Sequence, residues 1–172
     1  MKMIIEKLRT ITHDQVRPLL EARSQLDSRT GIVMVKLDVP PITGDLGQQY
    51  DFYAARVLPV ARGNQNYVNP HYHLRGNEPY RFLSKSTGEM NIGTMRGDEV
   101  AWNIRKTTAQ DDEIIMQGGE VHSFRNTSDT PVDFVFSCPA SHLVDNEPEH
   151  PEGDRYFTRS LKNGVPPWYS DS

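Results

Sequence analysis

From Gly31 onward the sequence consists of short β-type segments separated by turn residues, and this pattern restricts the fold more than any other feature. Apolar and β-branched residues gather in short runs, and Gly, Pro, Asn or Asp residues fall between them. Short strands at a spacing of roughly 8–12 residues predict an all-β sandwich or barrel. The segments expected as strands are 32–39, 50–60, 66–75, 80–83, 89–95, 100–104, 113–116, 122–125 and 132–138.

The two ends of the chain depart from this pattern. Residues 12–26 carry apolar residues at helical spacing, which predicts a short helix. Past Pro139 the sequence is rich in proline and lacks periodicity, but it contains aromatic residues such as Tyr156 and Trp168 that indicate packing on a surface. We therefore divide the chain into an N-terminal helical extension (1–30), a β-barrel (31–139) and an irregular C-terminal tail (140–172) that packs on the barrel or on a partner subunit.

Composition excludes several classes of protein. The 172 residues carry a formal net charge of −4 with Lys and Arg spread along the chain, so no basic stripe indicates nucleic acid. No apolar run approaches the roughly 20 residues of a membrane helix. The single cysteine, Cys138, cannot form an internal disulfide, which favours a reducing compartment. We expect a cytoplasmic protein that acts on a small molecule.

Four side chains of the metal-binding type form a split cluster. His71 and His73 lie two residues apart, so on an extended segment they share one face; Glu78 follows, and His122 comes after the Gly118–Gly119 pair. Three imidazoles and one carboxylate can hold a divalent ion and leave it a net charge of about +1. We favour Fe(II), and Mn(II), Ni(II), Co(II) and Zn(II) remain alternatives because no cysteine is near.

These residues resemble the two motifs of the cupin superfamily. Residues 70–73 with Glu78 resemble the first motif, His-x-His followed by Glu, and residues 112–126 resemble the second, in which Gly119, His122 and Asn126 fall on family positions. The chain departs from the family at Asp111, where Gly is usual, and at Gln117, where Pro is usual; both positions affect turns and not ligands. The resemblance covers about residues 63–126. It implies an antiparallel double-stranded β-helix, a jelly-roll-like barrel with one metal in its mouth, and a homodimer.

Strand alternation suggests further site residues. Tyr80 shares a face with Glu78 and is a candidate to donate a hydrogen bond to substrate. Arg56 is either an anion clamp inside the barrel or a charge at its rim. His142 and His150 lie in the tail, and we assign both to the surface.

Three functions fit this sequence. The favoured one is a dioxygenase that uses O2 on a compact polar metabolite such as an organic acid or enol. The second is a metal-dependent sugar-phosphate isomerase, epimerase or lyase, because residues 78–80 and 137–140 are weakly similar to cupin-type phosphoglucose isomerases. The third is a non-catalytic cupin that binds a small ligand.

Overall fold

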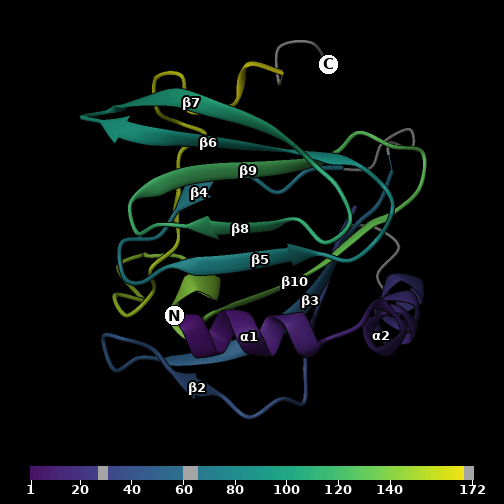
Figure 1. The fold of residues 1–172 in the computed structure, drawn as a ribbon. Coiled ribbons are helices and arrows are strands. Elements are labelled where there is room, and N and C mark those ends of the chain that lie inside the picture. The colour runs from purple at the N-terminus through teal and green to yellow at the C-terminus, as the bar shows by residue number, and fades with distance from the viewer. Residues whose placement is uncertain (27–30, 60–65, 169–172) are drawn as a thin grey trace.

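Two antiparallel β-sheets face each other in the computed structural model, which describes residues 1–26, 31–59 and 66–168 (Figure 1). The expected all-β double-stranded β-helix is confirmed. The first sheet has the order β1-β3-β10-β5-β8, with β2 beside β3. Its strands are β1 (Ile32–Lys36), β2 (Ile42–Thr43), β3 (Gln49–Val57), β5 (Glu78–Phe82), β8 (Glu113–Met116) and β10 (Val132–Pro139).

The second sheet has the order β11-β4-β9-β6-β7. The chain passes from β3 in the first sheet to β4 in the second, and then alternates between the sheets with few exceptions, so strands distant in sequence become neighbours. In this way His71 on β4 pairs directly with His122 on β9. The strands of this sheet are β4 (His71–Tyr72), β6 (Gly88–Arg96), β7 (Glu99–Thr108), β9 (Glu120–Asn126) and β11 (Tyr156–Phe157).

The space between the sheets is filled by aromatic side chains. Phe82, Phe124 and Phe134 are almost fully buried, and their ring centroids lie 5.2 to 5.7 Å apart. Tyr80 and Phe136 continue this cluster toward one end of the sandwich, with their rings stacked at 5.6 Å. Aromatic pairs at such distances add to the stabilisation that area burial alone provides.

Two helices, rather than the single one expected, cover the outer face of the first sheet. Figure 1 shows α1 (Lys2–Thr10) and α2 (His13–Leu26) on the side of β3, β10 and β5. Ile4 and Leu8 of α1 are buried in a second apolar cluster together with residues of α2 and the sheet. Neither helix is long and apolar enough to cross a membrane.

Because helices cover the first sheet, β3 is buried on both faces, and this decides the position of Arg56. Phe52 and Ala54 pack in the apolar cluster beneath the helices, and Arg56 shares their face. Its Nε and Nη2 donate to the two carboxylate oxygens of Asp133, at 2.7 and 2.8 Å. His13 of α2 lies 2.8 Å from the same carboxylate. The structure therefore places Arg56 in a buried ion pair outside the sandwich, away from His71, His73 and His122.

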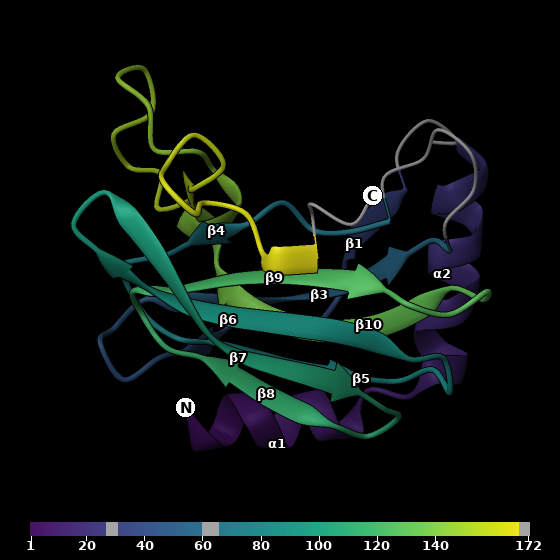
Figure 2. The same cartoon turned by 90° about the horizontal axis from the view of Figure 1, so that it is seen from above.

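The C-terminal tail packs on the barrel of its own chain. It contains a 3₁₀ turn, Ala140–Leu143, and the short strand β11, which pairs with β4. Tyr156 stacks on Tyr72 at 5.0 Å. Figure 2 shows the tail, in yellow, beside β4 and above β9. Residues 27–30, 60–65 and 169–172 of the expected segments lie outside the described residues, and the homodimer stays a prediction.

The pair between Arg56 and Asp133 can be tested by mutation. Asp133→Ala should lower the free energy of unfolding by about 3 kcal/mol, because it leaves the guanidinium buried without its counter-charge. Chemical denaturation followed by circular dichroism measures the change. Asp129→Ala, in an exposed turn, is the control and should stay within about 0.5 kcal/mol of wild type. A loss below about 1 kcal/mol for Asp133→Ala, typical of an exposed pair, would contradict this account.

Candidate metal centre

Three of the expected ligands converge at one end of the sandwich. His71 lies on β4, His73 follows that strand directly, and His122 lies on β9. Their ring centroids are 4.4 Å apart for His71 and His122, 4.9 Å for His71 and His73, and 5.6 Å for His73 and His122. One ring nitrogen of each lies within 4.8 Å of those of the other two. The alternation that the sequence predicted thus brings both histidines of the His-x-His pair to the same side.

Backbone carbonyls determine which nitrogen each imidazole presents. The Nδ1 atoms face the carbonyl oxygens of residues 69, 154 and 120, at 2.6 Å for His71, 2.9 Å for His73 and 3.2 Å for His122. A carbonyl oxygen can only accept a hydrogen bond, so each Nδ1 carries the proton. Each Nε2 therefore keeps its lone pair, which is the form that binds a metal.

Burial keeps these imidazoles neutral. It lowers the pKa of His71 well below its ordinary value, and the neighbouring imidazoles lower it further. Burial also lowers the pKa of His73 to about 4, although the charge of Glu78 opposes the shift. The pKa of His122 is lowered for the same reason, again against the charge of Glu78. At neutral pH all three rings are free of the second proton that would block a metal.

Glu78 lies beside the three histidines with both of its oxygens hydrogen bonded. Oε1 accepts from the Tyr80 hydroxyl, and Oε2 lies 3.0 Å from His142 Nδ1 and 3.3 Å from His73 Nε2. Burial would raise the pKa of this carboxyl, but the hydrogen bond with His142 and the nearby imidazoles outweigh it and lower the pKa to about 2. Glu78 is thus an anion, held next to the ligand nitrogens.

Tyr80 occupies the position expected for it. Its hydroxyl lies 3.3 Å from His122 Nε2 as well as against Glu78. Burial and the Glu78 carboxylate raise its pKa well above the ordinary value, so the hydroxyl keeps its proton and acts as a donor. It orients Glu78 and lies at the edge of the space that the ligand nitrogens surround.

His142 also belongs to the site, and its assignment to the surface was wrong. It is 1% exposed, and its ring stacks on that of His73 at 4.0 Å and 3°. Its Nε2 lies 2.6 Å from the carbonyl oxygen of Arg75. With His73 and Glu78 it forms a second group of ligand atoms within 4.8 Å of one another. The tail has no periodicity that could have indicated this; His150, by contrast, is exposed.

Asp154 links the tail to the histidine segment. Its backbone oxygen is the acceptor for His73, and its carboxylate accepts from the backbone N–H groups of Leu74 and Arg75 at 3.0 and 2.8 Å. The carboxylate is fully buried and also lies 3.5 Å from His142 Nε2. The tail therefore fixes both His73 and His142.

The donor set fits a divalent transition metal. His71, His73 and His122 would supply neutral nitrogen atoms. Glu78 lies outside the group that these three histidines form, so its side chain would have to shift slightly to supply an anionic oxygen. Borderline metals prefer such mixed nitrogen and oxygen donors. Metal-bound histidines almost always donate their other ring N–H to a fixed acceptor, and the hydrogen bonds from each Nδ1–H to a backbone carbonyl provide this.

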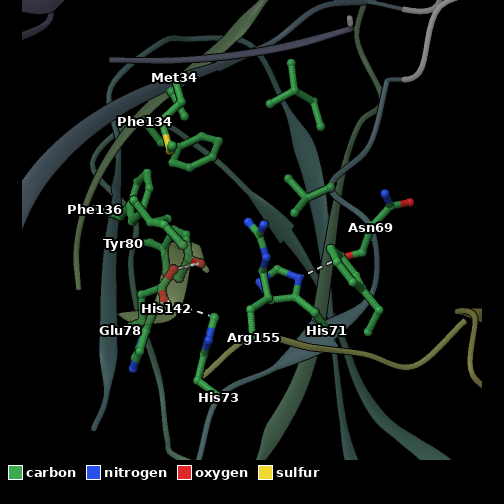
Figure 3. A pocket seen from close by; sticks show the side chains of 15 residues that line it. Met34, Asn69, His71, His73, Glu78, Tyr80, Phe134, Phe136, His142 and Arg155 are labelled. Carbon is green, nitrogen blue, oxygen red and sulfur yellow. Dashed lines mark hydrogen bonds and ion pairs between the residues drawn. The ribbon is translucent and has the colours of Figure 1, made fainter. Parts of the chain in front are cut away.

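His71, His73 and Glu78 line a cavity of about 260 Å³. More than half of its lining residues are apolar, including Ile32, Met34, Val68, Phe134, Phe136 and Leu143. Figure 3 shows the aromatic wall of Tyr80, Phe134 and Phe136 on one side and Asn69 on the other, with His71, His73 and Glu78 below. Small-molecule sites combine such apolar walls with a few placed polar groups.

The fold and the two His-containing motifs place this chain among proteins with the cupin fold. No family model matches the sequence, and no curated protein matches it either. Similar solved structures include the L-ribose isomerase of Cellulomonas parahominis with L-ribose (17% identity, 83% of this chain and 77% of that chain, TM-score 0.52). An oxalate oxidase is 21% identical over 62% of this chain (TM-score 0.46), and this chain spans half of its length. A cupin superfamily protein of Desulfitobacterium hafniense is 8% identical over 63% of this chain and 76% of that chain (TM-score 0.42).

Metal retention should depend on individual histidines. His71→Ala and His122→Ala should abolish it, because each removes a ligand nitrogen. His142→Ala should weaken it by about 10- to 100-fold, as loss of a group that orients a ligand does. Elemental analysis after dialysis against a graded chelator measures the retained metal. His150→Ala is the control and should equal wild type; equal behaviour of all four variants would refute the ligand assignment.

Acid should destabilise the metal-free protein. Its buried histidines have pKa values below the ordinary 6.5, so between pH 6.5 and about 4 the unfolded chain binds protons that the folded chain does not. Stability therefore falls as the pH decreases, by up to about 1.4 kcal/mol per pH unit for each such histidine. Glu78 adds a further loss at lower pH, toward its pKa of about 2.

Denaturation in the presence of EDTA at several pH values tests this slope. His73→Asn should give a shallower decline than wild type, since it removes one of the titrating groups. A slope that His73→Asn leaves unchanged would show that its imidazole is not buried as described.

Proposed function

We propose that this chain is a mononuclear metal-dependent enzyme, and that it is a dioxygenase acting on a compact metabolite with a polar end and an apolar body. The observation that carries this proposal is the pairing of a neutral three-histidine set with a cavity whose walls are mainly apolar. The polar end of the substrate would meet the ligand cluster, and its body would pack on the aromatic wall.

The apolar lining of the cavity favours a dioxygenase over an enzyme that acts on sugars. A polyhydroxylated substrate needs a hydrogen-bonding partner for each buried hydroxyl, and burying one without a partner is costly. Phe134, Phe136 and Val68 provide no such partners. An apolar cavity suits O2 and also excludes water from reactive species.

Each side chain of the site would have a distinct role in this reaction. When bound, a metal such as Fe(II) would supply the redox chemistry with O2 that amino-acid side chains cannot perform. His71, His73 and His122 would hold it, and Glu78 would leave the site a net charge of about +1 that attracts an anionic oxygen. Tyr80 stays protonated and fixes Glu78, and it would donate to a substrate oxygen only by giving up its hydrogen bond with Glu78.

A metal-dependent aldose–ketose isomerase is the second candidate. It is favoured by the likeness to the L-ribose isomerase, which extends over most of this chain. Isomerisation requires a base that removes a proton from carbon. Glu78, with a pKa near 2 and both oxygens hydrogen bonded, is a weak base. This is why we place the isomerase second.

Oxygen uptake distinguishes the two candidates. Protein loaded anaerobically with Fe(II) should consume O2 when offered members of a panel of small 2-oxo and 2-hydroxy acids with apolar side chains. Zn(II)-loaded protein should consume none, and mass spectrometry with labelled O2 should find the label in the product. Conversion of a substrate at an unchanged rate without O2, or anaerobic conversion of L-ribose, would refute the dioxygenase.

A further inference from the structure

We propose that Arg155, from the C-terminal tail, binds a carboxylate group of the substrate and so selects small carboxylic acids with an apolar body. This inference deepens the proposed function, because it assumes that the cavity beside the histidines is the substrate site. It gives Arg155 the anion-binding role for which the sequence had offered Arg56.

The tail holds Arg155 at the cavity in a fixed orientation. Its Nε donates to Asp145 at 2.5 Å, and its guanidinium carbon lies 5.3 Å from the centroid of the Phe157 ring. Phe157 in turn pairs with His71 between β11 and β4, with ring centroids 6.0 Å apart. A chain of contacts thus joins the guanidinium to the ligand cluster.

The terminal nitrogens of this guanidinium remain for a ligand. The hydrogen bond to Asp145 uses Nε, and no hydrogen bond from Nη1 or Nη2 to another described residue is present. In Figure 3 the Arg155 guanidinium lies between two sides of the cavity. Tyr80, Phe134 and Phe136 form one side, and Asn69 is on the other. Its position between two walls of the cavity suits contact with a bound molecule.

The charges of the cavity favour an anion with a single carboxylate. Arg155 is the one Lys or Arg among the described residues that line it. Its side chain is 29% exposed, so its charge is partly screened yet still accessible from the cavity. Asp145 pairs with its Nε and partly balances its charge, while the Glu78 carboxylate is bound by Tyr80 and His142. A guanidinium edge with two N–H groups binds a carboxylate in a bidentate manner.

The size and walls of the cavity restrict the rest of the ligand. A volume of about 260 Å³ admits a compact molecule, and the apolar lining favours an aromatic or branched aliphatic body. Such a ligand would place its carboxylate on Arg155 and its body against Phe134 and Phe136. Large acids and dicarboxylates would leave polar groups without partners.

Binding of benzoate and of benzamide to the Zn(II)-loaded protein tests the proposal by calorimetry. The two probes have nearly the same shape and differ in charge. Wild type should bind benzoate more tightly than benzamide. Arg155→Gln should weaken benzoate binding by at least about tenfold, the value of a charged hydrogen bond, and change benzamide binding less than twofold. Arg155→Lys should retain part of the preference.

Controls separate this role from a structural one. Arg96→Gln, at an exposed arginine on β6, should bind both probes as wild type does. Because the Arg155–Asp145 pair is partly exposed, Arg155→Gln should fold with a Tm within about 3 °C of wild type. Equal losses for both probes, unchanged benzoate binding in Arg155→Gln, or no preference in wild type would each overturn the proposal.

The outcome is independent of the dioxygenase chemistry, since Zn(II) does not react with O2. A binding preference that depends on Arg155 would stand even if no oxygen uptake were found. Oxygen uptake without that preference would support the reaction and refute the role of Arg155.

Discussion

The side chains of His71, His73 and His122 each donate Nδ1–H to a backbone carbonyl, and the rest of the site depends on these hydrogen bonds. They fix the tautomer, and they aim three Nε2 lone pairs at a common space. Burial then keeps the rings neutral by lowering their pKa values. Without these acceptors, the same residues could present protonated nitrogens, which bind no metal. The backbone therefore determines the chemistry of the side chains.

The fold provides these acceptors from three separate segments. The carbonyl for His71 comes from the same segment, that for His122 from its own strand β9, and that for His73 from Asp154 in the tail. The pairing of β4 with β9 and with β11 holds the three segments together. The tail is consequently part of the site, where it supplies His142 and Arg155 as well. An account limited to the barrel would omit four of the fifteen residues that line the cavity: His142, Leu143, Arg155 and Phe157.

Sequence reasoning was strongest where one local rule decides the structure. Alternation along strands and turn residues between them predicted the β-fold and placed His71 and His73 on one face. It could not orient β3, because most of its residues on both faces are buried, and so Arg56 was offered either as an anion clamp inside the barrel or as a charge at its rim. The helix α1 was missed, and only its packing on the sheet explains its buried Ile4 and Leu8. His142 was misplaced because the tail has no period, and long-range contacts alone bring it to Glu78.

The tautomers of the histidines test this account most directly. Nuclear magnetic resonance of ¹⁵N-labelled, metal-free protein near neutral pH distinguishes rings protonated at Nδ1 from rings protonated at Nε2. The account predicts that His71, His73 and His122 all carry the proton on Nδ1. It also predicts that titration with Zn(II) shifts all three Nε2 resonances together and saturates at one ion per chain. Protonation at Nε2 in any of the three rings, or Nε2 resonances that respond to different ions, would contradict it.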